Sequence, residues 1–166
     1  PGPIASQKWF VEVVARAARA IPSDKLVIAF GSYSYDWKKG GETEANSVEQ
    51  AWLDARESGV VPIFDRTSGN SSFSYDENGV HRDVWIADAA TARNQLAALD
   101  TMGVRAAALW RLGTEDPSLW ALFGRADRKL PPAPVIQAIP AGTNVDIEGS
   151  GEILRIGAMP LSGERR

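Results

Sequence analysis

The chain contains no cysteine and a single histidine, His81, among its 166 residues. The absence of cysteine excludes disulfide bonds, thiolate catalysis and cysteine-ligated metal sites. One histidine excludes a metal centre built from several histidines of this chain. The composition therefore predicts no resident metal ion and gives no sign of another cofactor.

The sequence also lacks long apolar runs and clusters of basic residues. Without a long apolar run, we expect no segment of this chain to span a membrane. The net charge is −3, from 18 basic and 21 acidic side chains, which argues against binding to nucleic acid through a basic face. Hydrophobic residues make up 44% of the chain, which is enough for a globular domain with its own core.

Helix and strand patterns alternate along the first part of the chain. Apolar residues at helical spacing predict helices, and short apolar runs predict strands buried on both faces, as in a parallel sheet. Residues 73–86 instead predict an antiparallel hairpin around a turn at 76–79, and residues 32–46, which are polar and glycine-rich, predict a loop. The predicted helices cover residues 6–21, 47–59, 88–102 and 116–124, and the predicted strands cover residues 26–30, 60–64 and 104–110.

The composition changes near residues 131–134, where three prolines surround one alanine. We therefore predict an α/β domain at residues 1–128, a proline-rich linker at 129–141, and a short β segment at 142–166 that leads to a following domain. Two runs in this last segment have the pattern of short strands, residues 143–147 and 152–156.

Six tryptophans are many for a chain of this length and favour a protein that handles flat or ring-shaped ligands, although a tryptophan-rich core would give the same count. Trp110 is the most informative of them because it ends the strand predicted at residues 104–110. The C-terminal ends of parallel strands are where α/β barrels place ligand-facing groups. A flat indole there suits a sugar ring, which has an apolar C–H face. The alternative is a large core residue that caps the strand.

A second cluster of aromatic and acidic residues follows the strand predicted at residues 26–30. Four such side chains fall within five positions: Tyr33, Tyr35, Asp36 and Trp37. The aromatic rings could stack on a sugar, and the carboxylate could accept hydrogen bonds from its hydroxyl groups. Alternatively, the loop folds its own aromatic side chains onto the rim of the fold. Trp85, in the predicted hairpin, is either a wall of the same site or an anchor of the hairpin, with the anchor favoured.

No pair of carboxylates in the sequence has the pattern of a glycosidase acid and its partner. Asp65 follows a predicted strand and is the best placed acid by topology. Asp88 is most simply the N-cap of a helix, whereas Asp76 and Glu77 are turn residues. His81 lies in the hairpin, where a surface or hydrogen-bonded histidine is more common than a catalytic base. We therefore assign no catalytic residue to this chain.

Taken in order, several segments resemble the C-terminal part of a family 18 glycoside hydrolase, a chitinase-like (β/α)8 or TIM barrel. Residues 24–37 resemble the family's seventh strand and the loop after it. Residues 73–75 and 81–89 resemble the stretch before its last helix–strand unit, especially in relatives that act on spore-cortex peptidoglycan. Residues 108–117 resemble the eighth strand, and the resemblance implies that Trp110 floors the subsite for the N-acetyl sugar.

The resemblance also shows what this chain lacks. The family's Asp-x-x-Asp-x-Glu motif, which supplies the catalytic acid on the fourth strand, is absent from this sequence. The chain would then hold the last two strands of a TIM barrel with the hairpin insertion between them. The opening residues 1–5 do not resemble a natural start. We therefore expect a piece of a longer domain or, in isolation, self-association through exposed barrel edges.

The resemblance at both ends of the chain indicates a narrower group of proteins. Residues 1–6 and 149–155 resemble bacterial proteins in which such a barrel precedes a polysaccharide deacetylase and a family 2 glycosyltransferase. The resemblance implies as partners the upstream remainder of the barrel, the two downstream domains, and an N-acetylglucosamine-containing glycan. It also implies a location at the outer face of a bacterial cytoplasmic membrane.

The residues and the resemblance together predict a carbohydrate-active segment of a protein that makes or processes an N-acetylglucosamine polymer, chitin-like or peptidoglycan-like. The catalytic acid would lie outside this chain, so we expect the isolated chain to be inactive. The alternative is a non-catalytic glycan-binding or scaffold module. A nucleotide-binding domain is disfavoured because no glycine-rich phosphate loop follows a predicted strand. The residues predicted to form part of the sugar cleft are Trp110, Tyr33, Tyr35, Asp36, Trp37 and Trp85.

Overall fold

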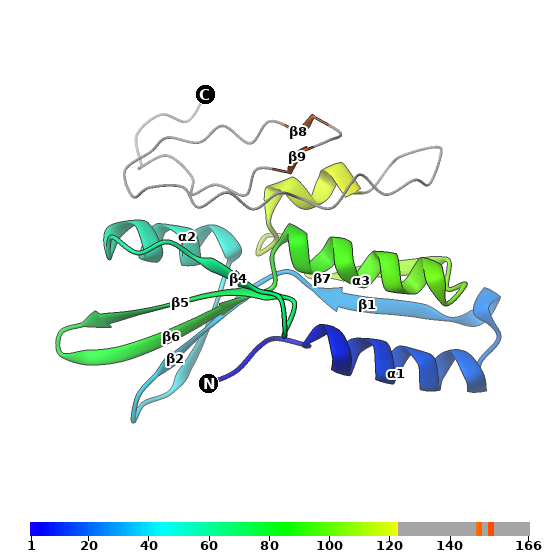
Figure 1. Cartoon of the computed structure of the whole chain (residues 1–166), viewed down its shortest axis with the longest axis horizontal. Coiled ribbons are helices and arrows are strands. Elements are labelled where there is room, and N and C mark those ends of the chain that lie inside the picture. The colour runs from blue at the N-terminus through cyan, green and yellow to red at the C-terminus, as the bar shows by residue number, and fades with distance from the viewer. Residues whose placement is uncertain (123–148, 151–152, 155–166) are drawn as a thin grey trace.

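The computed structural model describes residues 1–122, 149–150 and 153–154, and within them the chain has two main sheets, each packed against helices (Figure 1). The smaller of these sheets is parallel and the larger is antiparallel. The predicted α/β class is confirmed. The elements up to residue 122 are α1 (Gln7–Ala20), η1 (Ser23–Lys25), β1 (Val27–Gly31), β2 (Ser34–Lys38), β3 (Thr43–Asn46), α2 (Val48–Glu57), β4 (Ile63–Asp65), β5 (Asn70–Glu77), β6 (Val80–Ile86), α3 (Ala89–Thr101), β7 (Ala106–Trp110) and η2 (Pro117–Leu122).

The parallel pair of β1 and β7 carries the first core. Helix α1 buries Phe10 and Val14, which are four residues apart and therefore lie on one side of the helix. These side chains pack with Phe30 of β1 and Leu99 of α3. The two helices run alongside the parallel pair (Figure 1). This arrangement confirms the helices predicted at both positions.

The opposite face of the parallel pair is open, which corrects the prediction that these strands are buried on both faces. Val27 is 61% exposed. Ala29 and Ala108, which are partners in the parallel register, are exposed beside it. An apolar strand sequence indicates that the strand is suited to burial on both faces. It does not show that both covers lie within the described residues. Within the described residues, helices cover one face of this pair and leave the other to solvent.

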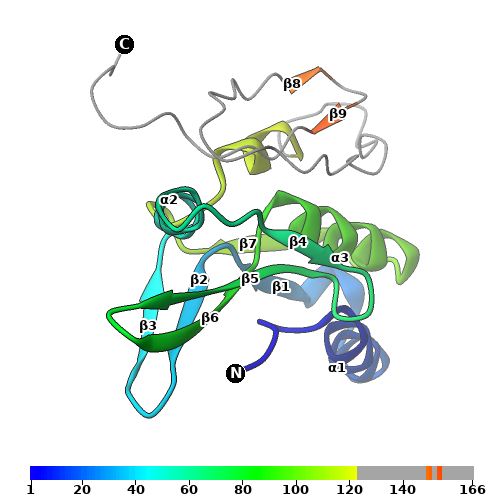
Figure 2. The same cartoon turned by 60° about the vertical axis from the view of Figure 1, so that its left-hand side comes forward.

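The antiparallel sheet has the strand order β3-β2-β6-β5-β4, and α2 covers one of its faces (Figure 2). Strands β5 and β6 form the predicted hairpin. Its turn contains Asn78 and Gly79 with φ values of 51° and 75°, which is the geometry of a tight two-residue turn. The second core, between this sheet and α2, consists of Val48, Ala51, Trp52, Ala55, Phe73, Val84 and Ile86.

The segment at residues 32–46 is not the predicted loop, because it holds the antiparallel strands β2 and β3. Strand β2 buries Ser34 and Asp36 on the face toward α2. Tyr35 and Trp37 lie on the other face, since successive residues of a strand point in opposite directions. The strand was missed because its buried positions are polar, so the hydrophobic pattern of a half-buried strand is inverted.

Two other elements differ from their predictions. The strand predicted at residues 60–64 is the shorter β4, which lies at the edge of the antiparallel sheet and pairs with β5. It is therefore not a buried parallel strand. The helix predicted after Asp116 begins where expected, but as far as residue 122 it is the 3-10 helix η2.

Side chains cap the N-termini of two of the helices, and one of them is the predicted cap Asp88. Ser47 accepts a hydrogen bond from the backbone N–H of Gln50 at 3.0 Å, at the start of α2. Asp88 accepts one from the N–H of Thr91 at 2.9 Å, at the start of α3. Each cap satisfies a backbone donor that the first helical turn leaves without a partner. Ser6 precedes α1 without such a side-chain bond.

Beyond residue 122, the structure describes two short strands, β8 (Gly149–Ser150) and β9 (Ile153–Leu154), which pair antiparallel. Strand β9 falls within the strand predicted at 152–156. The other predicted strand, at 143–147, and the predicted linker, at 129–141, lie outside the described residues. In the part of the chain that is described, no helix is long and apolar enough to cross a bilayer.

Candidate functional site

Trp110 stands at the C-terminal end of β7 with 66% of its surface exposed. It is in register with Gly31, the last residue of β1, so the two parallel strands end side by side. Gly31 carries no side chain that could cover the indole. Trp110 therefore belongs to neither core of the described residues, and its role as a ligand-facing residue stays a prediction.

A hollow of about 140 Å³ lies beside Trp110. Its walls combine the indole and two phenol rings with an amide and a hydroxyl group, and Arg111 adds a charged side chain. Apolar ring faces bordered by hydrogen-bonding groups suit a ring-shaped ligand that carries hydroxyl groups on its rim. The lining residues are Tyr33, Tyr35, Ala45, Asn46, Trp110, Arg111 and Thr114.

Tyr33 connects β1 to β2, and its ring lies against Gly31. A Cβ atom at residue 31 would stand 2.4 Å from Cε1 of Tyr33, so the ring occupies space that only a glycine leaves free. The ring meets Tyr35 edge-on, with the two centroids 5.3 Å apart. Burial, followed by the neighbouring Tyr35, raises the pKa of Tyr33. The phenol therefore stays neutral and can donate a hydrogen bond at neutral pH.

A second hollow, of about 510 Å³, shares Tyr33 and Tyr35 with the first. It is bounded by the N-terminal residues 2–6, by Trp9 of α1 and by Trp37 of β2. The rings of Tyr35 and Trp37 have centroids 5.9 Å apart. Trp37 therefore extends the aromatic surface but does not line the hollow beside the β7 tryptophan.

Trp85 lies on the same face of the antiparallel sheet as Tyr35, because the two residues are directly opposite in the β2–β6 register. We call this side of the sheet, which carries Tyr35, Trp37 and Trp85, the aromatic face. Trp85 is not among the residues that line the two hollows. Its predicted place in a hairpin strand is confirmed, and its role as a wall or an anchor stays a prediction.

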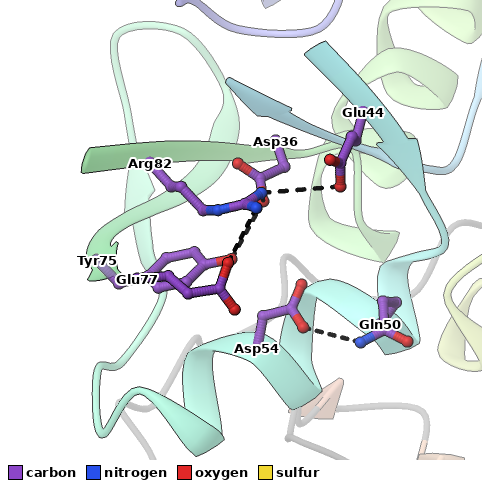
Figure 3. Close-up of polar contacts among 7 residues, drawn as sticks. All are labelled: Asp36, Glu44, Gln50, Asp54, Tyr75, Glu77 and Arg82. Carbon is purple, nitrogen blue, oxygen red and sulfur yellow. Dashed lines mark hydrogen bonds and ion pairs between the residues drawn. The ribbon is translucent and has the colours of Figure 1, made fainter. Parts of the chain in front are cut away.

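Asp36 lies on the opposite face of β2, between the sheet and α2 (Figure 3). Its side chain is 2% exposed. Its Oδ2 atom accepts hydrogen bonds from Nη1 of Arg82 at 2.7 Å and from the hydroxyl group of Tyr75 at 3.1 Å. The structure thus separates Asp36 from the aromatic residues beside it in the sequence. This placement does not fit the predicted role of accepting hydrogen bonds from sugar hydroxyl groups.

The loop at residues 111–116, between β7 and η2, is hydrogen-bonded to the connection between β1 and β2 and to the start of α2. The hydroxyl group of Thr114 donates to the carbonyl oxygen of Ser32 at 3.0 Å. The carbonyl oxygen of Thr114 accepts from the N–H of Val48 at 2.9 Å, where α2 begins. The N–H of Asp116 donates to the hydroxyl oxygen of Ser32 at 3.0 Å. These bonds hold the end of β7 against the start of β2.

Four residues of the hollow beside the indole were not singled out from the sequence. Ala45 and Asn46 belong to β3, a strand that the sequence did not predict. Arg111 and Thr114 lie within four residues of the end of the strand at Trp110, and this position alone could have marked them as candidates.

The acidic residues considered as catalytic groups serve the fold. Hydrogen bonds from the backbone of Thr67 and its neighbour lower the pKa of Asp65, which suits a turn residue and not a proton donor. Asp88 is the buried cap of α3. His81 is paired with Asp76 at 2.9 Å at the end of the hairpin. In the part that the structure describes, no group of three or more potential ligands from His, Cys, Asp and Glu could hold a metal ion.

No family model matches the chain. Several individual proteins are nevertheless similar to it in sequence. A cortical fragment-lytic enzyme of Bacillus anthracis is 29% identical over 118 residues, covering 68% of this chain and 27% of that protein. The uncharacterized glycosylase YvbX of Bacillus subtilis (strain 168) is 25% identical over 126 residues, covering 72% of this chain and 36% of that protein. The chain thus spans about a quarter to a third of the length of these curated relatives.

Solved structures agree with this result. The spore cortex-lytic enzyme SleL of Bacillus megaterium QM B1551 matches with a TM-score of 0.68 and 28% identity, over 74% of this chain and 30% of that one. A chitinase of Chromobacterium violaceum ATCC 12472 matches with a TM-score of 0.68 and 25% identity, over 73% of this chain and 38% of that one. The predicted resemblance to chitinase-like and spore cortex-lytic enzymes is confirmed: the chain is similar to these enzymes over about 70% of its length, which is consistent with a partial glycosylase domain.

Proposed function

We propose that this chain supplies part of the sugar-binding cleft of a glycosylase that acts on an N-acetylglucosamine polymer, chitin-like or peptidoglycan-like. The observation that carries the proposal is the exposed indole of Trp110, which shares a hollow with Tyr33 and Tyr35 at the end of two parallel strands. The names of the relatives, a chitinase and spore cortex-lytic enzymes, support this class of polymer.

In this proposal Trp110 stacks under one sugar ring through the apolar face of its indole. Tyr33, Asn46 and Thr114, which line the same hollow, supply hydrogen bonds to the hydroxyl and N-acetyl groups of the sugar. Trp37 extends the aromatic surface toward a further sugar unit. Each of these roles uses a side chain in the protonation state that it holds at neutral pH.

The parallel strands β1 and β7 would be the last two strands of a TIM barrel, with the antiparallel sheet as the insertion between them. The open apolar face of this pair supports the assignment, since further strands would cover it. The catalytic acid would come from an earlier strand. The deacetylase and glycosyltransferase domains, and the location outside the cytoplasmic membrane, belong to the same proposal.

The test is a titration of the chain with chito-oligosaccharides, followed by tryptophan fluorescence, with cello-oligosaccharides as the comparison. We expect saturable quenching that is specific to the N-acetylated series. Trp110→Ala should weaken binding by about 1 to 3 kcal/mol, because the stacking surface is removed. Its unfolding free energy should change little, since the indole is mostly exposed.

Trp120→Ala provides the matched control. Trp120 is also an exposed tryptophan, but it lies in η2 and lines neither hollow. We expect its substitution to leave the affinity unchanged. Equal affinities of Trp110→Ala and the unaltered chain would reject the placement of the sugar. Binding without hydrolysis by the complete domain would instead favour a non-catalytic glycan-binding module.

A further inference from the structure

Arg82 joins four strands of the antiparallel sheet through one guanidinium group (Figure 3). It projects from β6, and its side chain is 11% exposed. Nη1 lies 2.7 Å from Asp36 Oδ2 on β2 and 3.7 Å from Glu44 Oε2 on β3, and Nη2 lies 2.9 Å from Glu77 Oε2 on β5. Tyr75, also on β5, donates a hydrogen bond to the same oxygen of Asp36. We call these five side chains the Arg82 cluster.

A contribution to folding stability does not by itself explain why these charges are buried in the Arg82 cluster. Asp36 is almost fully buried, yet its Oδ1 atom and Nε of Arg82 have no hydrogen-bond partner within the described residues. Taking two charges out of water costs about as much as their attraction returns, so apolar residues in their place are often as stable. Asp54 of α2 adds repulsion, because burial and then the charge of Asp36 raise the pKa of Asp54.

Hydrophobic patterning does not fix the register of β2 either. The two residues that β2 buries toward α2 are Ser34 and Asp36, and both are polar. The large aromatic side chains of the strand, Tyr35 and Trp37, lie on the other face. A slip by one residue would turn each of them toward α2, where apolar side chains form the second core. The apolar content of β2 therefore favours the wrong register.

The Arg82 cluster opposes this slip. Arg82 is in register with Lys38, and it reaches diagonally to Asp36, two residues along β2. After a one-residue slip, the carboxylate would lie on the aromatic face, out of reach of the guanidinium group. The ion pair forms when Tyr35 and Trp37 face away from α2, which is the arrangement that places Tyr35 at both hollows and Trp37 at the larger one.

We propose that Arg82 and Asp36 are positioning residues that set the register of β2 and so present Tyr35 and Trp37 on the aromatic face. The consequence for ligand binding rests on the proposed sugar site. The register itself is a property of the free chain and can be measured without a sugar.

The experiment is NMR of the 166-residue chain, following the backbone NOEs between Tyr35 and Trp85, which face each other in the native register. Arg82→Met should lose or replace these NOEs and weaken chito-oligosaccharide binding at least tenfold. Arg82→Lys, which retains a cation for the buried carboxylate, should restore both. Asp76→Asn, the control, removes the exposed pair with His81 in the same hairpin and should change neither.

Should Arg82→Met fail to fold, the double variant Asp36→Asn/Arg82→Met takes its place, because it removes both buried charges together and keeps position 36 polar. We expect it to unfold cooperatively but to show non-native NOEs for Tyr35. Native NOEs in this variant would overturn the proposal. A changed register in a protein whose unaltered form binds no sugar would reject the proposed function and leave the register inference standing.

Discussion

At the level of single residues, the site depends on the absence of one side chain as much as on the presence of others. Gly31 ends β1 opposite Trp110, and the ring of Tyr33 fills the space where a side chain of residue 31 would stand. Because both rings border the same hollow, the glycine sets how far apart they can lie. A change at this position should therefore alter the site without altering the core.

Gly31→Ala should weaken chito-oligosaccharide binding by roughly tenfold, about 1.4 kcal/mol. The new Cβ would stand 2.4 Å from the ring of Tyr33, so the ring must move. The backbone of residue 31 is that of a strand and tolerates alanine, so the unfolding free energy should change by less than about 1 kcal/mol. Fluorescence titration and urea denaturation measure the two effects.

A double-mutant cycle isolates the cause of that loss. In a Tyr33→Ala background there is no ring to displace, so Gly31→Ala should have no further effect on affinity. If it weakens binding equally in both backgrounds, the displaced phenol is not the reason.

At the level of elements, the loop between β7 and η2 joins the site to α3 through a buried carboxylate. Asp116 is 0% exposed and accepts hydrogen bonds from the N–H groups of Ala89 and Ser118, both at 2.8 Å. Burial, followed by the charge of Asp88, raises the pKa of Asp116 to about 6. The loop that follows Trp110 is therefore anchored by a group that loses its proton near neutral pH.

We expect the free energy of unfolding to fall as the pH rises from about 4 to about 6. The pKa of Asp116 is near 3.8 in the unfolded chain and about 6 in the folded one, so the folded state binds more protons over this interval. Stability must then decrease with pH, by up to roughly 3 kcal/mol. Asp88, whose pKa is also raised by burial, acts in the same direction. Urea denaturation at several pH values measures the slope.

Asp116→Asn tests the assignment of this slope. The variant should lose the Asp116 contribution and become less stable by about 1 to 3 kcal/mol, because one amide oxygen replaces two acceptors for two backbone donors. Asp65→Asn should leave the slope between pH 4 and 6 nearly unchanged, because hydrogen bonds lower the pKa of Asp65 and its contribution to the pH dependence lies below about pH 4. A stability that does not vary with pH in the unaltered chain would contradict the expectation.

Among the helices and strands, the sequence could predict those that depend on local signals. Helices α1, α2 and α3 and the hairpin follow from apolar spacing, caps and a turn signal, which are all local. Strand β2 could not be predicted this way because Asp36 fills a buried position. Its partner, Arg82, lies 46 residues away along the chain. A pattern within a short window carries no information about such a pairing.

The same difference between local patterns and long-range pairing explains which site residues the sequence could predict. Trp110 and Tyr33 were predicted because they follow strands with clear apolar runs, where ligand-facing residues are expected. Asn46 could not be predicted, since it enters the hollow from β3, an unpredicted strand. Asp36 was placed with its aromatic neighbours because the sequence did not show that a strand would turn it to the opposite face.

At the scale of the whole molecule, the two cores are joined by the loop after β7, and within the described residues one apolar face of the parallel pair is exposed. Val27, Ala29 and Ala108 share the exposed face of the parallel pair with Trp110. A sheet face of this kind is normally covered by other elements. The relatives are three to four times as long as the matched segment, which is consistent with a cover supplied by another part of the domain.

In isolation, we therefore expect the 166-residue chain to self-associate through this face. Ala29→Lys places a charge at its centre without disturbing the core, because Ala29 is exposed, and it should shift the chain toward the monomer in sedimentation velocity. Asp100→Asn changes the net charge by the same amount on the exposed side of α3 and should leave association unchanged. A chain that is monomeric and unfolds cooperatively without either substitution would show that the open face needs no cover, and would weaken its assignment to the interior of a barrel.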